Sequence, residues 1–170
     1  MKLYFLRHGE SDPQGSKREE DRQMTDAGRR SLRAAARLWR RLDIRPEVVI
    51  SSPRQRVIDS AELFIDGVAL SERLVIDERL APGAKWPDFA IALAQHPQIS
   101  SALFVGHEPD LSSSIEFLTG AASVKMREGS ICCIEFAGSP SGSSGTLTFL
   151  IDPDLYKKED GRDAPTCAPD

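Results

Sequence analysis

The sequence comprises 170 residues, of which 40% are hydrophobic and 28% are charged, a composition typical of one globular domain with a substantial core. The formal net charge of −4 argues against general nucleic-acid binding, which needs a basic surface, but it allows a small local basic pocket. No apolar run approaches the roughly 18–20 residues that span a bilayer, and no signal peptide is evident, so we expect a cytoplasmic protein without a membrane partner.

Strands and helices alternate through the first 120 residues. Apolar runs predict strands at residues 2–6, 46–52 and 101–107, with a short extended piece inside residues 72–84. Amphipathic spacing and end signals predict four helices: from a Thr25 N-cap to about Leu42, from Pro53 to about residue 65, over residues 86–95, and over 108–120, where Gly120 closes the helix.

The last part of the chain has a different pattern. Two apolar segments, residues 129–138 and 145–152, flank a glycine- and serine-rich stretch and predict a hairpin. The whole pattern predicts an α/β fold: a three-layer sandwich with a mostly parallel central sheet, helices on both faces and an antiparallel edge hairpin. We assign residues 1–155 to a single domain and expect residues 156–170, which lack apolar periodicity, to form a disordered tail.

The cysteines indicate a reduced protein. Cys132 and Cys133 are adjacent in a predicted strand, so their side chains should point to opposite faces, a poor framework for a disulfide or a zinc site.

Chemically distinctive residues follow three of the predicted strands. These strand ends read Arg7-His8-Gly9, then Ser51-Ser52-Pro53 with Arg54 and Arg56 close behind, and Gly106-His107-Glu108. Because ligands bind at the carboxyl ends of parallel strands, we expect two arginines and two histidines to converge on one pocket.

Those residue types suit phosphate chemistry. Arginine forks bind phosphate oxygens bidentately, helix N-termini add backbone donors, and a histidine ring can accept a phosphoryl group as a nucleophile. A lone histidine at a strand end is more often structural, and we interpret His96 as a helix-end or surface residue. His8 and His107 differ because each follows an apolar strand and adjoins a glycine that permits close approach to a ligand. The sequence therefore predicts phosphoryl transfer without a metal or other cofactor.

Four short segments resemble the histidine phosphatase superfamily, also called phosphoglycerate-mutase-like. "LRHGES" resembles its signature, "MTDAG" its "LTxxG" helix start, "SSPRQRVIDSA" its "SSPxxRxxxTA" segment, and "FVGHEP" the segment with its second histidine. They occur in family order between residue 3 and about residue 120. Each match alone is weak, but together they are a strong indication.

The resemblance implies roles for individual residues. His8 matches the phosphorylated nucleophile, Arg7 and Arg56 match phosphate-binding arginines, and His107 matches the histidine that helps to hold the phosphoryl group. Gly9, next to the nucleophile, is also assigned to phosphate binding. Glu10 also belongs to the motif. Arg54 precedes the matching arginine by two positions, which on a helix turns it roughly 200° away, so we assign it to the surface.

The departures from the family pattern indicate a branch. The chain reads "RHGESDPQ" where mutases continue "RHGESxWN", and the stretch "IDERLAPGA" is short where longer members carry an insertion with a catalytic acid. Length and this compact middle resemble the SixA-type phosphohistidine phosphatases. The resemblance implies a phosphohistidine-bearing protein as the substrate and partner.

Chemistry gives a reason for a missing acid. Cleaving a phosphate ester expels an alkoxide, which needs a positioned general acid, whereas a protonated imidazole is a much better leaving group. If an acid exists, the candidates are Asp77, Glu78 and Glu108, each of which is by spacing a surface charge or an arginine partner.

Three alternatives stay open at this point. The protein would be a phosphomonoesterase or mutase for small phosphorylated metabolites if residues 77–88 placed a carboxylate near the leaving group. It would be a phosphate-binding module if turnover had been lost, although intact Arg7, His8, Arg56 and His107 argue against this. A metal site on the two histidines is disfavoured because the neighbouring arginines would repel a cation.

Overall fold

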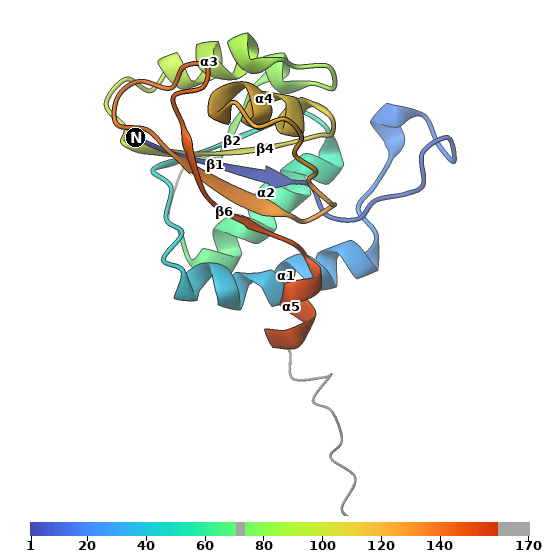
Figure 1. Cartoon of the computed structure of the whole chain (residues 1–170). Helices are drawn as coiled ribbons and strands as arrows, with labels where there is room; N and C mark the ends of the chain where they lie inside the picture. The colour runs from blue at the N-terminus through green and yellow to red at the C-terminus, as the bar shows by residue number, and fades with distance from the viewer. Residues whose placement is uncertain (71–73, 160–170) are drawn as a thin grey trace, which may run out of the picture.

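The computed structural model of the protein describes residues 1–70 and 74–159, and at its centre lies a six-stranded sheet with the strand order β3-β2-β4-β1-β5-β6 (Figure 1). The strands are β1 (Lys2–Arg7), β2 (Val48–Ser51), β3 (Leu74–Ile76), β4 (Ser101–Gly106), β5 (Ile131–Glu135) and β6 (Thr146–Ile151).

The pairing of these strands places three of the predicted strand ends side by side. Strands β1 to β4 are mutually parallel, with Arg7 opposite Gly106 and Ser51 opposite Val105. Strand β5 runs antiparallel to β1, and β6 returns antiparallel to β5. The predicted α/β class, with a mostly parallel sheet and an antiparallel edge hairpin, is confirmed.

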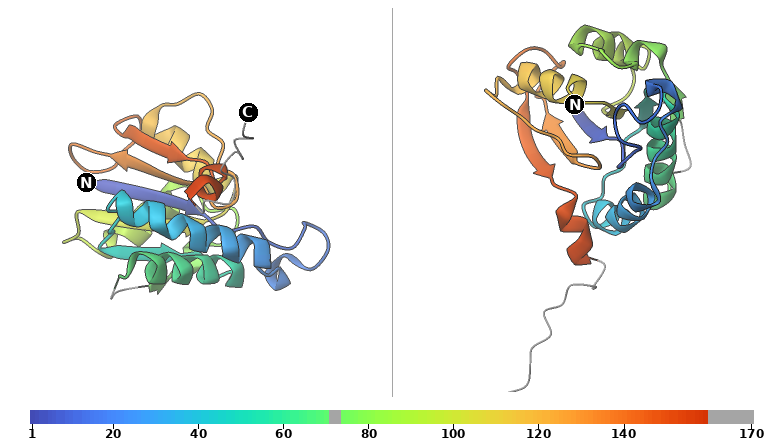
Figure 2. Two further views of the ribbon diagram at one scale, coloured as in Figure 1. Left: turned by 90° about the horizontal axis from the view of Figure 1, so that it is seen from below. Right: turned by 90° about the vertical axis from the view of Figure 1, so that its right-hand side faces the viewer.

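Helices cover both faces of the sheet, as the two further views make plain (Figure 2). One face carries α1 (Asp26–Arg41), α2 (Gln55–Val68) and α5 (Asp154–Glu159), and the other carries α3 (Trp86–Ala94) and α4 (Asp110–Thr119). Two buried clusters result, one around Trp39 and Phe64 and the other around Phe89 and Phe104. Two short 3-10 turns, η1 (Glu19–Asp21) and η2 (Glu78–Leu80), complete the elements.

Helix α1 forms as its sequence predicts. The Thr25 hydroxyl oxygen caps it by accepting from the Gly28 backbone N–H at 3.0 Å, and the apolar stripe that includes Leu32 and Trp39 is fully buried. Gly28 has a second role, because a Cβ there would lie 2.3 Å from the backbone oxygen of Glu10. The helix start therefore packs directly against the chain that leaves the β1 strand.

Helix α2 begins later than we predicted. Its first residue is Gln55 and not Pro53, because Arg54 keeps an extended backbone, with φ −73° and ψ 132°, and takes the N-cap position. The extended backbone also changes the direction in which the Arg54 side chain points.

The expected tail also begins too early. We predicted that the chain would leave the fold at residue 156, but Tyr156 lies in α5 with its side chain fully buried against Trp39, and its hydroxyl donates to the Gly129 carbonyl at 2.9 Å. A single aromatic anchor without periodicity gives no helical signal in a short segment. Residues 160–170, including Cys167, lie outside the described residues.

The paired cysteines behave as the alternation of a strand requires. Cys132 belongs to the cluster under α3 and α4, and Cys133 to the cluster under α1 and α2. Both are buried and free. They therefore act as small core residues on opposite faces of β5.

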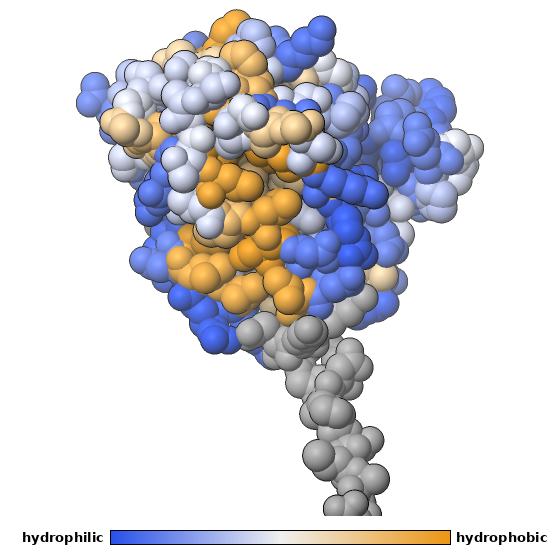
Figure 3. All heavy atoms as spheres, in the orientation of Figure 1, coloured by the Kyte–Doolittle hydropathy of each residue, from blue (hydrophilic) through white to orange (hydrophobic). Residues whose placement is uncertain are grey.

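One face of the molecule carries an apolar area (Figure 3). Leu147 and Leu150 of the edge strand β6 and Leu155 of α5 are the exposed large hydrophobic residues of this region. None of them contributes to the site described next.

Candidate active site

His8 lies at the carboxyl end of β1 and is 4% exposed. The backbone N–H of His8 donates to the Gly106 carbonyl at 3.2 Å, which ties this strand end to β4. Its ring nitrogen Nδ1 lies 2.8 Å from the Gly9 carbonyl oxygen. Because a carbonyl only accepts, Nδ1 carries the proton, and Nε2 of the neutral ring keeps a free lone pair.

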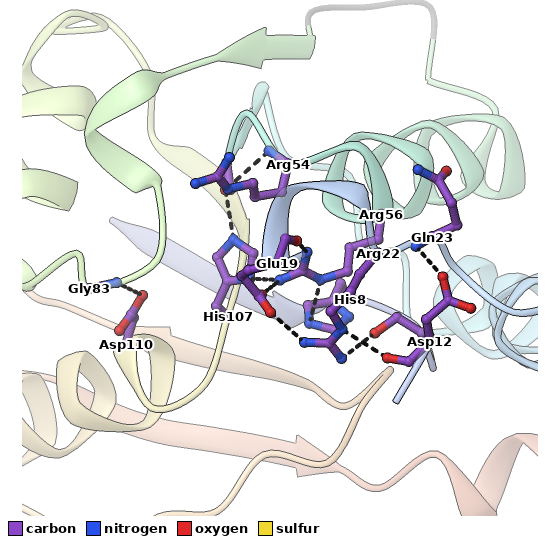
Figure 4. Close-up of polar contacts among 12 residues, drawn as sticks. His8, Asp12, Glu19, Arg22, Gln23, Arg54, Arg56, Gly83, His107 and Asp110 are labelled. Carbon is purple, nitrogen blue, oxygen red and sulfur yellow. Dashed lines mark hydrogen bonds and ion pairs between the residues drawn. The ribbon is translucent and has the colours of Figure 1, made fainter. Parts of the chain in front are cut away.

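Arg56 reaches that lone pair from the first turn of α2. It is 1% exposed, and its Nε donates toward His8 Nε2 at 3.5 Å. One guanidinium nitrogen, Nη2, lies 3.2 Å from His107 Nδ1. A buried cation thus bridges the two histidines (Figure 4).

His107 lies just beyond β4, 4% exposed, with its ring centroid 5.5 Å from that of His8. Its Nε2 is 2.7 Å from the hydroxyl of Ser52, which follows β2. With Arg56 donating to Nδ1, the neutral ring donates from Nε2 to the Ser52 oxygen. Ser52, beyond the end of β2, and Arg56, in the first turn of α2, therefore fix the orientation of this imidazole.

Both histidines are held neutral. Burial, which outweighs the hydrogen bond to Gly9, lowers the pKa of His8 to about 3, and the charges of Arg56 and Arg7 act in the same direction. Burial likewise lowers the pKa of His107 to about 3, assisted by repulsion from a protonated His8 whenever the two rings would both be charged and by the charges of Arg56 and Arg54. At neutral pH the site therefore holds fixed arginine charges beside two uncharged imidazoles.

Arg7 approaches from the side of β5. Its Nη1 donates to the Met126 carbonyl at 2.8 Å, and Nη2 lies 3.9 Å from the Glu128 carboxylate. Its Nε is buried and has no hydrogen-bond partner within the described residues. An unsatisfied buried donor is unusual and marks a place where an anion would be bound favourably.

The loop between β1 and α1 contributes residues that sequence reasoning missed. The Glu19 carboxylate pairs with Arg56 Nη2, and Arg22 Nη1 donates to the other Glu19 oxygen at 2.9 Å. Arg22 is itself fixed by bonds to the Asp12 carbonyl at 2.8 Å and the Ser11 hydroxyl at 2.9 Å. The many charges of this segment show no spacing that singles out two of them.

Two serines were also missed as supports. Besides Ser52 on His107, Ser60 accepts from the Gly9 N–H at 3.0 Å and donates to the Arg56 carbonyl at 2.6 Å. Ser60 therefore links the glycine beside the nucleophile to the helix that carries Arg56. The only sequence signal was its position four residues after that arginine.

The candidate acids are placed as follows. Glu78 is exposed in η2, and Asp77 accepts from the Arg79 backbone and guanidinium. Glu108 is half-buried and accepts from the Ser112 N–H at 3.3 Å and from its hydroxyl. Burial raises the pKa of Glu108, although the Ser112 hydroxyl and the charge of Arg7 oppose this.

Arg54 does not lie where we predicted. Its side chain is half-buried beside His107, its Nε is buried without a partner among the described residues, and its charge lowers the pKas of both His107 and Arg56 after the larger effect of burial (Figure 4). The 200° argument failed because Arg54 precedes the helix with an extended backbone. Arg54 therefore adds a further positive charge at the site.

Glu10, which belongs to the first motif, and His96, the third histidine, lie at the margin of the site. The Glu10 carboxylate accepts from the Thr25 hydroxyl at 2.8 Å and so supports the start of α1. His96 follows α3 and is half-exposed, outside the group of site residues.

The described residues contain neither a cluster of metal-binding side chains nor a helix that could span a membrane. No group of three or more His, Cys, Asp or Glu side chains in residues 1–70 and 74–159 is arranged to hold a metal ion. Within the same residues, no helix combines the length and apolar character needed to cross a membrane.

The family model of the histidine phosphatase superfamily (branch 1) matches residues 3–82. No curated protein matched the sequence.

Several solved structures share the fold. The protein histidine phosphatase SixA complexed with tungstate has a TM-score of 0.80 at 20% identity, covering 91% of this chain and 99% of that one. A putative SixA phosphohistidine phosphatase from Agrobacterium tumefaciens has a TM-score of 0.75 at 18% identity, covering 89% and 97%. A mycobacterial glucosyl-3-phosphoglycerate phosphatase has a TM-score of 0.67 at 18% identity, covering 86% and 96%.

Proposed function

We propose that the chain, whose residues 3–82 match the family model of the histidine phosphatase superfamily (branch 1), is a phosphatase that removes phosphate from phosphohistidine in signalling proteins through a covalent intermediate on His8. The observation that carries the proposal is the state of the His8 ring. Its Nε2 carries no proton because Nδ1 donates to Gly9, and the only contact that this atom accepts among the described residues is a long one, 3.5 Å, from the buried guanidinium of Arg56. A neutral imidazole aimed at an arginine-lined pocket suits nucleophilic attack on phosphorus.

The first step transfers the phosphoryl group to the enzyme. His8 Nε2 forms a bond to phosphorus while the bond from phosphorus to the substrate imidazole breaks in line. Arg7 and Arg56 neutralise the phosphoryl oxygens, and His107 helps to hold the group. The second ring nitrogen of the substrate carries a proton, so the leaving group departs as neutral imidazole without an enzyme acid.

Water completes the cycle. Its oxygen bonds to phosphorus as the bond to His8 Nε2 breaks, and His8 leaves as a neutral ring because Nδ1 still holds its proton. The proton that the attacking water loses stays on the phosphate that is formed, and His107 keeps the hydrogen bond that its Nδ1 accepts from Arg56. Inorganic phosphate then departs.

The arrangement of carboxylates supports phosphohistidine over phosphate esters. Asp77 is paired with Arg79, Glu108 is bonded to Ser112, and Glu78 is exposed. None of the three is a free acid held toward His8. Two solved structures with similar folds are described as SixA proteins, which agrees with this choice.

One observation favours a second function, a phosphomonoesterase for small metabolites. Burial raises the pKa of Glu108, which follows His107 directly and lies close enough to Arg7 for that charge to affect it. A protonated Glu108 released from Ser112 would supply the acid that an ester needs.

The test is phosphate release from a phosphohistidine-bearing protein domain, phosphoserine and a sugar phosphate at equal concentrations. We expect the phosphohistidine domain to be preferred, Glu108→Gln to leave that preference and its rate unchanged, and His8→Ala to lose at least about 10⁴-fold in kcat. Preference for the esters with a loss in Glu108→Gln would establish the second function. Turnover retained by His8→Ala would exclude the covalent mechanism, and release from none of the substrates would leave a binding module.

A further inference from the structure

Glu19 fills a position that suits an oxyanion. One carboxylate oxygen pairs with Arg56 Nη2, the other accepts from Arg22 Nη1 at 2.9 Å, and the Glu19 backbone oxygen accepts from Arg56 Nη1 at 3.0 Å (Figure 4). Two guanidinium groups on a pair of anionic oxygens are the arrangement that also recognises phosphate.

This contact uses the groups that the proposed reaction requires. Arg56 is 1% exposed, and both of its terminal nitrogens are committed to Glu19, while only Nε faces His8. A phosphoryl group attached to His8 would need those same terminal nitrogens. It cannot have them while Glu19 remains in place.

We propose that Glu19 is an internal competitor for the phosphoryl group: its carboxylate closes the site at rest, and an incoming oxyanion binds by displacing it. This inference rests on the proposed function, since it takes the same site as the place where phosphate binds. The competition would make Glu19 a residue that controls how tightly the site binds oxyanions and which oxyanions can enter it.

The loop is built so that its tip can move while its base stays. At the base, the Thr25 N–H donates to the Glu10 carbonyl at 2.9 Å, the Asp12 N–H to the Gln23 carbonyl at 2.9 Å, and Ser11 forms a bridge with Met24. At the tip, none of the η1 residues is buried, and the Glu19 side chain is 44% exposed. Displacement therefore exposes little apolar surface to water.

Arg22 would remain when Glu19 leaves. Its side chain is only 12% exposed and is held at the loop base by Asp12 and Ser11. Opening therefore leaves two fixed guanidinium groups facing the entering anion. A dianionic phosphoryl group gains more from them than the single charge of Glu19 does, which provides the free energy for displacement.

Glu19 is ionised in the resting site. Burial alone would raise its pKa, but the hydrogen bond from Arg22 and the charge of Arg56 hold the pKa below its usual value. The competitor is therefore a carboxylate at neutral pH, and its removal should be measurable as tighter anion binding, because apparent affinity scales with the fraction of open sites.

The test is tungstate binding by isothermal calorimetry with the full chain at fixed pH and ionic strength. Glu19→Gln removes the charge and keeps the size, so we expect binding about tenfold tighter than in the wild type, the effect of releasing a modest ion pair. Glu19→Asp keeps the charge but shortens the side chain by one methylene, and we expect it to bind nearly as tightly as Glu19→Gln.

Glu20→Gln is the matched control. It removes the same charge one position away, from a side chain that is 54% exposed and pairs with Arg18 rather than with the site. We expect its affinity for tungstate to stay within about twofold of the wild type.

The outcomes separate the two proposals. Wild-type binding that Glu19→Gln does not tighten overturns the competition and leaves the proposed function standing. Equal tightening by Glu20→Gln, or wild-type affinity in Glu19→Asp, assigns the effect to net charge and also overturns it. If neither the wild type nor any variant binds tungstate, the oxyanion site itself is wrong, and both proposals fail.

Discussion

The two sides of His8 differ in how completely their arginines are satisfied. On the side of the β1–α1 loop, both terminal nitrogens of Arg56 are bonded to Glu19, and Arg22 is bonded on three of its atoms. On the side of β5, Arg7 donates from Nη1 to Met126, while its Nε is buried and has no partner in the described part of the chain.

This difference separates two functions of a cation in a phosphate site. Arg7 is left partly unsatisfied and is ready to bind, so its contribution to anion affinity is available at once. Arg56 is already hydrogen-bonded to Glu19, so the free energy that it gains from binding an anion is reduced by the free energy of the Glu19 contact that it loses. Within one pocket, Arg7 is therefore preorganised to bind an anion and Arg56 is not.

The largest expected effect tests this asymmetry directly. Arg7→Ala and Arg56→Ala should each lower kcat/KM by about 10²–10³-fold, the usual loss for one electrostatic donor. In a Glu19→Gln background, however, the Arg56→Ala loss should grow by about a further tenfold, because the carboxylate that competes for Arg56 Nη2 is gone. The Arg7→Ala loss should be the same in both backgrounds.

Steady-state kinetics on the three single and two double variants, beside the wild type, would measure both couplings. If Glu19→Gln changed the Arg7→Ala loss as much as the Arg56→Ala loss, Glu19 would not act on Arg56 in particular, and the proposed difference between the two arginines would be wrong. A loss below tenfold for either arginine would remove that residue from the site.

A smaller effect concerns the two imidazoles that lie between these sides. Their pKas of about 3 in the folded protein lie below the ordinary 6.5, so the unfolded chain takes up these protons first as the pH falls. This contribution to stability is therefore complete above about pH 6.5 and is lost between about pH 6.5 and 3, by up to ~1.4 kcal/mol per pH unit for each histidine.

Urea denaturation at several pH values between 7 and 4 would measure that slope. His8→Asn and His107→Asn should each remove about one histidine's share of it. Slopes identical to that of the wild type would mean that the two rings are protonated in the folded protein at those pH values.

The smallest effect concerns Arg54, which lies beside His107. Its Nε is buried and has no hydrogen-bond acceptor within residues 1–70 and 74–159. Removal of the Arg54 side chain should weaken tungstate binding by up to about fivefold and reduce the dependence on salt, as expected for a partly screened charge. Arg33→Ala, on the exposed surface of α1, is the matched control and should change nothing. Equal effects of the two variants would return Arg54 to the surface, as the helical geometry first predicted.

The elements of the fold were predictable because each follows from local pattern. The Thr25 cap and the stripe that ends at Trp39 define α1, and alternation in β5 places Cys132 and Cys133 on opposite faces. Tyr156 was missed because its burial depends on a cavity formed by distant residues, and a single aromatic residue in a charged segment has no period to detect.

The site divides in the same way. His8, Arg56 and His107 come together as predicted because parallel strand ends share an edge, so topology alone brings them close. Glu19 and Arg22 were not predictable, because an irregular loop has no fixed geometry until it is closed by its own contacts. Arg54 was misplaced by an error of only two residues in the start of a helix.

The close packing of Gly28 against Glu10 has a consequence for how this protein can be modified. The glycine fixes the base of the β1–α1 loop to the helix that follows, so residues 13–21 form an excursion that starts and ends on a rigid frame. We expect changes of length and sequence in this segment to leave the strand that carries His8 in place, since the loop base is held by its own contacts. Redesign of the anions that can enter the site should therefore begin in that segment, with Glu19 kept in view because it contacts Arg56.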